Sequence, residues 1–216
     1  MTSTLVSFFM IHPQRSLAAF KELVGTWQGI LVSDGYGLYK KWMHGRQTCL
    51  AHLIRRATGV SEHPDEDIAA VGAAIKKALQ QLCHMAKAPP SESEWNAFYD
   101  RLMLIFELNG ECDDEAGKLV RHLMRELNSL WTFLNVNGVE PTNNIAERSL
   151  RFPVTYRKRS FGTRNDCGER FIERIMSLRQ TCRRQSRRTF PVLVNAFQSW
   201  LNNSTPDVSF LSKNTP

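Results

Sequence analysis

The chain lacks the features of a secreted or membrane-embedded protein. No apolar run approaches the roughly 20 residues that span a bilayer as a helix, and no internal repeat or low-complexity tract is present. The apolar run at residues 5–11 has no basic leader and no small-residue cleavage site, so it does not indicate a signal peptide. Five cysteines, an odd number at irregular spacing, are typical of reduced thiols. These absences predict an intracellular, cytoplasmic protein.

Acidic residues are scarce in one part of the chain. From Ile145 to Phe190 there are 13 Lys and Arg against 4 Asp and Glu, a net +9, whereas the 216-residue chain carries +7 in total. The remainder is therefore close to −2, and the basic charge is local. A local basic patch indicates a polyanionic partner, with nucleic acid ahead of a membrane surface.

The stretch from Val139 to Gly162 reads VEPTNNIAERSLRFPVTYRKRSFG, and Glu147 is its only acid after Glu140. A carboxylate in a basic surface is what a metal-dependent enzyme acting on a polyanion needs. It is equally what a helix salt bridge looks like, since Glu147 and Arg151 stand at i, i+4, a pairing worth about 0.2–0.5 kcal/mol. The residues alone leave both interpretations open.

The first third of the chain predicts a strand, a helix and a second strand. Thr4–Ile11 is rich in β-branched and aromatic residues, Ser16–Val24 has helical apolar spacing, and Gly29–Ser33 is again apolar. Two parallel strands with this connection would form a right-handed βαβ unit. Asp34 would then lie at the carboxyl end of a strand, where sites form in such sheets. The alternative is that Asp34 forms a turn before Gly35.

A third strand is expected at Gln47–Leu50, and it leads into a helix. Cys49 and His52 form a C-x-x-H pair, which is half of a zinc site by spacing. No second clean pair accompanies it, so we expect a packed thiol and a hydrogen-bonded imidazole, and zinc is not expected.

The pattern from Asp65 to Leu134 is helical throughout. Its apolar stripes face a core, and Ser91-x-x-Glu94 is a capping box that opens one of its helices. A further helix should hold Glu147 and end at Pro153. After it the pattern predicts a basic amphipathic helix at Glu169–Arg184, an apolar helix at Phe190–Leu201, and a loose polar tail.

Three blocks together carry a resemblance to a known family. They are GILVSDGYGLY (29–39), CLAHLIRRA (49–57) and EPTNNIAERSLRFPVTYRKRSFGTRNDCG (140–168). In these blocks the chain resembles the bacterial insertion-sequence-66 family of transposases, which have a ribonuclease-H-like core and a DDE catalytic triad. The resemblance extends over roughly residues 8–201 and is weakest in the helical middle.

The resemblance implies a DNA transposase that performs metal-dependent phosphodiester hydrolysis and strand transfer. Asp34 would be the second triad acid and Glu147 the third, and both would be catalytic ligands of a two-metal site holding Mg²⁺ or Mn²⁺. The partner would be DNA, as transposon ends and target, in the bacterial cytoplasm and associated with the nucleoid, with no membrane partner and with a homo-oligomer left open. The residues expected to contact DNA are Asn143, Asn144, Arg148, Arg151, Arg157, Lys158, Arg159 and Arg164.

The sequence departs from the family at its beginning. The first triad aspartate would lie on a strand before Leu5–Ile11, yet no acid occurs before Glu22. We therefore expect an α/β, N-terminally incomplete ribonuclease-H-like core that does not catalyse transposition as written, because two carboxylates hold a metal pair loosely. The alternatives are a non-catalytic DNA-binding or regulatory protein derived from a transposase, and a remnant that does not fold alone.

The expected organisation has four parts. A partial core with the second acid covers residues 1–57, a helical insertion covers residues 58–138, and core helices with the third acid and the basic segment cover residues 139–202. The tail covers residues 203–216.

Overall fold

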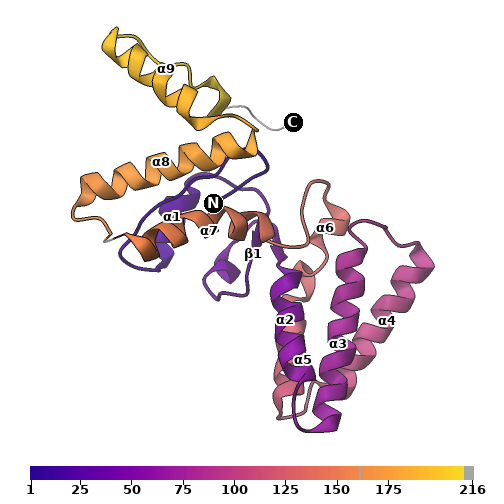
Figure 1. Ribbon diagram of the computed structural model, residues 1–216. Coiled ribbons are helices and arrows are strands. Elements are labelled where there is room, and N and C mark those ends of the chain that lie inside the picture. Colours follow the sequence, from indigo (N-terminus) through magenta and orange to yellow (C-terminus); the bar gives the residue numbers. More distant parts are fainter. Residues whose placement is uncertain (161, 212–216) are drawn as a thin grey trace. The chain divides into compact units, whose positions relative to one another are not determined.

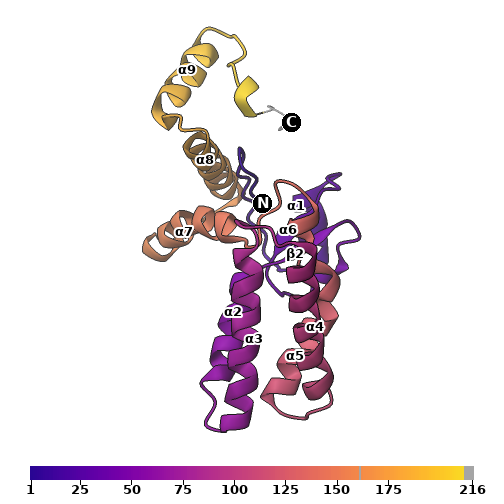
Figure 2. The same cartoon turned by 90° about the vertical axis from the view of Figure 1, so that its right-hand side faces the viewer.

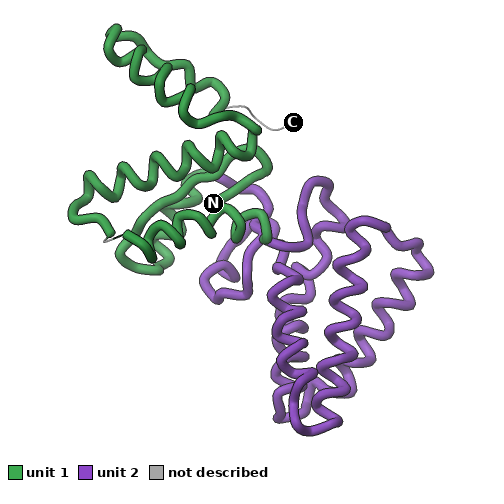
Figure 3. Tube along the Cα trace, viewed as in Figure 1, with its two compact units in different colours: residues 1–26, 144–216 green, residues 27–143 purple. Residues whose placement is uncertain are grey.

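The structure is a computed structural model that describes residues 1–160 and 162–211 (Figure 1). It forms two compact units, coloured separately in Figure 3. Unit 1 contains residues 1–26 and 144–216, and unit 2 contains residues 27–143. The divisions predicted at residues 57, 138 and 202 follow the sequence blocks and stay predictions. Among the described residues, no helix is both long and apolar enough to cross a membrane.

Unit 2 contains the one sheet found in the described residues, a parallel pair of short strands. Strand β1 (Leu31–Ser33) pairs with β2 (Arg46–Thr48), and the 3-10 helix η1 (Tyr39–Lys41) lies in the connection between them. Both strands fall within or beside ranges that the sequence predicted. Because the strands are parallel, their carboxyl ends meet at one edge, where Asp34 follows β1 and Cys49 follows β2.

The strand predicted at Thr4–Ile11 is wrong, and with it the βαβ unit. Ser3 N–H donates to the Val6 carbonyl (2.8 Å), which closes a turn inside the segment. The following residues are extended, but their alternate N–H groups face helix α8 (Asp166–Arg184) instead of another strand. Ser7, Phe9 and Ile11 donate to side chains spaced four residues apart on α8, those of Thr181 (3.1 Å), Ser177 (2.9 Å) and Glu173 (2.5 Å). The described part of the chain is mostly helical, so an α/β ribonuclease-H-like core is not confirmed.

The helical block predicted between residues 65 and 134 is confirmed. Its long helices, with the one that follows β2, lie side by side in both views of the ribbon (Figures 1 and 2). Ser91 and Glu94 form the predicted capping box. The elements are α2 (Leu50–Ser61), α3 (Glu66–His84), α4 (Glu92–Asn109), α5 (Glu115–Glu126), the 3-10 helix η2 (Leu127–Ser129) and α6 (Thr132–Asn135). Their inner faces form one apolar core centred on residues such as Leu53, Ile75, Leu79, Leu102 and Leu123.

The helices of unit 1 largely follow the sequence prediction. Ser16 caps α1 (Leu17–Val24) by accepting from the Ala19 N–H (3.2 Å), as its position before the apolar run indicated. The other elements are α7 (Asn144–Arg159), α8 (Asp166–Arg184), α9 (Thr189–Leu201) and the 3-10 helix η3 (Ser209–Leu211). Phe210 of η3 is buried, and its carbonyl accepts from Gln185 Nε2 (3.0 Å). Residues 212–216 of the predicted loose tail lie outside the described residues.

The prediction that Pro153 ends its helix is wrong, because α7 continues to Arg159. Proline has no N–H, so it leaves the carbonyl four residues earlier without its helical donor. That carbonyl belongs to Ser149, and it accepts from the side chain of Gln180 on α8 (3.3 Å). A donor from another helix thus replaces the missing one, and the backbone can continue past the proline.

Glu126 ties the strands of unit 2 to the end of α5. Its side chain is 1% exposed and forms ion pairs with Lys40 (2.5 Å) and Arg46. Thr48 Oγ1 donates to it at 2.8 Å, and Ser129 Oγ donates to the Glu126 carbonyl at 2.8 Å. Burial alone would raise the pKa of Glu126, but the bonds from Lys40 and Thr48 and the charge of Arg46 outweigh it and lower the pKa to about 2.

Glu126→Gln should destabilise the protein by about 3 kcal/mol, because it removes the buried counter-charge of Arg46 and Lys40. The lowered pKa also has a pH signature. Its stabilisation is complete above pH 4.5 and is lost as the pH falls from 4.5 toward 2. Chemical denaturation at several pH values should show this loss in the wild type and not in Glu126→Gln. Glu107→Gln, at an exposed position of α4, is the matched control. Equal stability of both variants would contradict the role of Glu126.

Gln180→Ala should destabilise the protein by about 1–3 kcal/mol, the cost of leaving a buried carbonyl unpaired. The cost should shrink in a Pro153→Ala background, because alanine restores the helical N–H that Ser149 lacks. A double-mutant cycle by thermal or urea denaturation measures this coupling. Additive effects of the two substitutions would show that Gln180 does not compensate for Pro153.

Candidate functional site

Asp34 lies directly after β1, at the strand end where the sequence placed it. Its carboxylate oxygen Oδ1 accepts from the Tyr36 N–H (3.2 Å), so Asp34 also forms the turn that was the alternative interpretation. The side chain is half-buried. One carboxylate oxygen therefore fixes the loop, and the residue remains at the edge of the sheet that the prediction specified.

His122 of α5 lies beside this turn, and the sequence analysis missed it. A methyl group placed on Gly35 would be 3.6 Å from both Cε1 and Nε2 of the imidazole. His122 is 7% exposed, and its Nε2 is buried without a hydrogen-bond partner among the described residues. Burial, reinforced by the positive charges of Arg56 and Lys40, lowers the pKa of His122 to about 4. A neutral imidazole therefore stands beside Gly35, the residue after Asp34, at neutral pH.

A signal for His122 was present in the sequence. His122 and Glu126 are polar residues at i, i+4, and they interrupt the leucine stripe of α5. Polar side chains on a core-facing helix surface require partners, so such a pair indicates a polar site under the helix.

Cys49 and His52 lie at the start of α2. Cys49 is fully buried at the N-cap of that helix, and its sulfur accepts from the Asn143 N–H (3.3 Å). The next residue, Leu50, donates its N–H to the Pro141 carbonyl (3.0 Å). Within residues 1–160 and 162–211, no group of three or more His, Cys, Asp or Glu side chains could hold a metal ion. Because the Cys49 sulfur accepts from the Asn143 N–H, Cys49 anchors the chain segment that leads to Asn143.

Glu147 is exposed on the first turn of α7. It lines a shallow hollow of about 490 Å³ together with Asn144, Arg148, Arg151 and two apolar residues. Glu147 belongs to unit 1 and Asp34 to unit 2, so the two predicted acids come from separate compact units (Figure 3). The predicted basic residues Arg157, Lys158 and Arg159 form the exposed last turn of α7, and Arg164 is exposed in the loop after it.

A second hollow, of about 570 Å³, lies between α7 and α8 and is strongly basic. Four arginines line it and no acid does. They are Arg148 and Arg151 of α7 with Arg183 and Arg184 of α8. We name this surface the arginine hollow. Its two α8 arginines were not among the predicted DNA-binding residues.

The arginine hollow is held in shape by contacts at its base. Arg184 donates to the Ile145 carbonyl (3.1 Å), Ser149 Oγ (3.0 Å) and Ser7 Oγ (3.2 Å). The guanidinium of Arg179 stacks 3.6 Å from the centre of the Phe152 ring, and its Nη1 is buried with no hydrogen-bond partner in the described part of the chain. By contrast, Arg148, Arg151 and Arg183 are exposed. The hollow therefore combines fixed positive charge at its base with accessible guanidinium groups at its rim.

Residues 2–170 match the model of a protein family described as "Transposase IS66 family". This match covers most of the chain, so the chain belongs to that family of transposases, and the predicted resemblance is confirmed. A search of curated proteins found no match, and a search of solved structures found none either. The α8 side of the arginine hollow and all of α9 lie beyond the matched residues.

Proposed function

We propose that this chain binds DNA through the arginine hollow as part of a transposase that cuts and joins DNA. The observation that carries this proposal is the acid-free lining of the hollow, with four arginines from two helices. Guanidinium groups bind phosphate oxygens in a planar, bidentate manner, and several of them facing one hollow follow a phosphate backbone better than a single small anion.

The base of the arginine hollow supports this function. Arg184 donates hydrogen bonds to acceptors of the protein itself, so its guanidinium is held in place and contributes a fixed positive charge to the hollow. The exposed Arg148, Arg151 and Arg183 are left to reach a ligand. The basic end of α7, with Arg157, Lys158 and Arg159, extends the positive surface along the same helix. Asn143, Asn144 and Arg164 stay proposed DNA contacts.

Asp34 and Glu147 are proposed as the catalytic carboxylates of this transposase. Bound Mg²⁺ or Mn²⁺ ions would activate the attacking oxygen and stabilise the leaving oxygen of the phosphodiester. Both residues supply the oxygen ligands that these ions prefer. They represent two of the three acids of a DDE site, and the described residues contain no three-ligand cluster that would complete it.

Arginine substitutions in the hollow should weaken DNA binding and its dependence on salt. Arg148→Ala and Arg183→Ala should each reduce the slope of log K against log [salt] by about 1, because each removes one phosphate contact. Lys77→Ala, an exposed lysine on α3, is the matched control for loss of one charge. Fluorescence anisotropy with a labelled duplex at several salt concentrations measures the slopes. The proposal fails if Lys77→Ala lowers the slope as much as the two arginine substitutions do.

Asp34→Asn and Glu147→Gln should each abolish any Mg²⁺- or Mn²⁺-dependent nicking of supercoiled DNA and leave DNA binding intact. Each substitution removes a metal-binding charge with little change in shape. Asp100→Asn, at an exposed position of α4, controls for the loss of one acid. Nicking that survives both substitutions would overturn the catalytic assignment. Binding with no nicking by the wild type would instead indicate a DNA-binding protein without catalysis.

A further inference from the structure

Helix α9 presents an apolar face that none of the described residues of unit 1 buries. No residue of this helix is buried. Phe190 is 75% exposed, Phe197 59% and Trp200 68%. With Leu193 they recur at helical spacing and form one stripe along the helix. The rings of Phe197 and Trp200 stack on each other with centroids 5.7 Å apart, so this stripe carries a paired aromatic projection.

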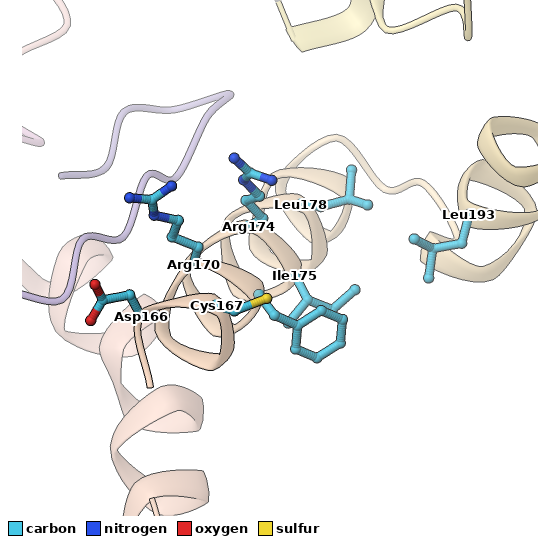
Figure 4. A pocket seen from close by; sticks show the side chains of 8 residues that line it. Asp166, Cys167, Arg170, Arg174, Ile175, Leu178 and Leu193 are labelled. Atoms are coloured by element: carbon cyan, nitrogen blue, oxygen red, sulfur yellow. The ribbon is translucent and has the colours of Figure 1, made fainter. Parts of the chain in front are cut away.

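A hollow with a largely apolar lining adjoins this stripe. It has a volume of about 630 Å³ and lies between α8 and α9, where Leu193 faces Ile175 and Leu178 (Figure 4). Phe171, also a lining residue, is 62% exposed. In Figure 4 the guanidinium groups of Arg170 and Arg174 project to a different side of α8 from Ile175. The hollow is thus apolar on the side of Ile175 and Leu178, while Asp166, Arg170 and Arg174 line it elsewhere.

We infer that this surface binds a second copy of the chain, with the α9 stripe of each copy in the α8–α9 hollow of the other. The surface contains both a projection and a hollow of apolar character, which is the condition for a two-fold contact in which one patch meets itself. The inference is independent of DNA binding, since it uses neither Asp34 nor the arginine hollow.

The area and the charge of the surface fit this partner. The exposed parts of Phe171, Phe190, Phe197 and Trp200 amount to on the order of 500 Å² at the usual areas of aromatic side chains. The exposed aliphatic side chains of α9 raise this toward ~700 Å², close to the ~800 Å² that each partner buries in a stable interface.

The lack of charged residues on α9 favours a protein partner over DNA. Helix α9 has no charged residue from Thr189 to Leu201, although the chain around it is strongly basic. An uncharged aromatic surface is typical of the centre of a protein interface, whereas a DNA contact needs cations. In the inferred contact, Arg170 and Arg174 of the hollow would therefore meet an uncharged helix and no further positive charge.

The test is the mass of the full chain in solution, measured by light scattering after size exclusion and by analytical ultracentrifugation at micromolar concentrations. The wild type should have twice the chain mass. Trp200→Glu on the projection and Phe171→Glu at the hollow should each give the mass of one chain. Leu108→Glu, at an exposed leucine of α4 in unit 2, is the matched control and should keep the double mass.

Circular dichroism and thermal melting separate loss of association from loss of folding. Trp200 and Phe171 are exposed, so both variants should keep the helical spectrum of the wild type. A wild type with the mass of one chain overturns the inference, and so does a double mass that persists in both variants. Dissociation by Leu108→Glu as well would overturn it too, because the contact would then not be specific to α8 and α9.

Discussion

Polar groups that leave water must find partners, and this constraint shapes both units of the protein. In unit 2 the Glu126 carboxylate gathers Lys40, Arg46 and Thr48, and so joins η1 and β2 to the end of α5. In unit 1 the Ser149 carbonyl, freed by Pro153, draws the side chain of Gln180 across from α8. The Glu126 contacts hold β2, which forms the edge of the sheet near Asp34. The Ser149–Gln180 bond joins α7 to α8, and the arginine hollow lies between these two helices. Breaking either would leave a buried charge or carbonyl unpaired, at a cost of one to several kcal/mol.

The family match supports the proposed catalytic acids, and the arginine hollow supports the proposed DNA binding. The family match covers residues 2–170 and includes both proposed acids. The arginine hollow needs Arg183 and Arg184, which lie beyond the match, so its chemistry is an independent reason to expect a phosphate-rich partner. The proposed acids stand in separate units, whereas every residue of the hollow lies in unit 1. The proposed DNA-binding surface therefore lies within one unit, whereas the two proposed acids belong to different units.

Local sequence signals predicted local structure well. The Ser16 cap and the Ser91–Glu94 capping box depend on residues a few positions apart, and both are found in the structure. The position of Asp34 after a strand followed from the short apolar run before it. The sequence predictions were wrong where the local structure depends on residues far away in the sequence. Strand propensity at Thr4–Ile11 could not reveal that its N–H groups would be satisfied by α8, and Pro153 alone could not reveal the donor 27 residues later, Gln180. The polar pair His122 and Glu126 on α5 indicates a buried polar site, but the residue that His122 faces, Gly35, is set only in the folded chain.

In the proposed function, α7 and α8 together form the DNA-binding surface. Hydrogen exchange of the full chain, with and without a DNA duplex, tests this most directly because it locates protection along the sequence. DNA should slow exchange in α7 around Arg148 and Arg151 and in α8 around Arg183, and should leave exchange in α3 and α4 unchanged. Protection concentrated in α3 and α4, with α7 and α8 unaffected, would contradict it.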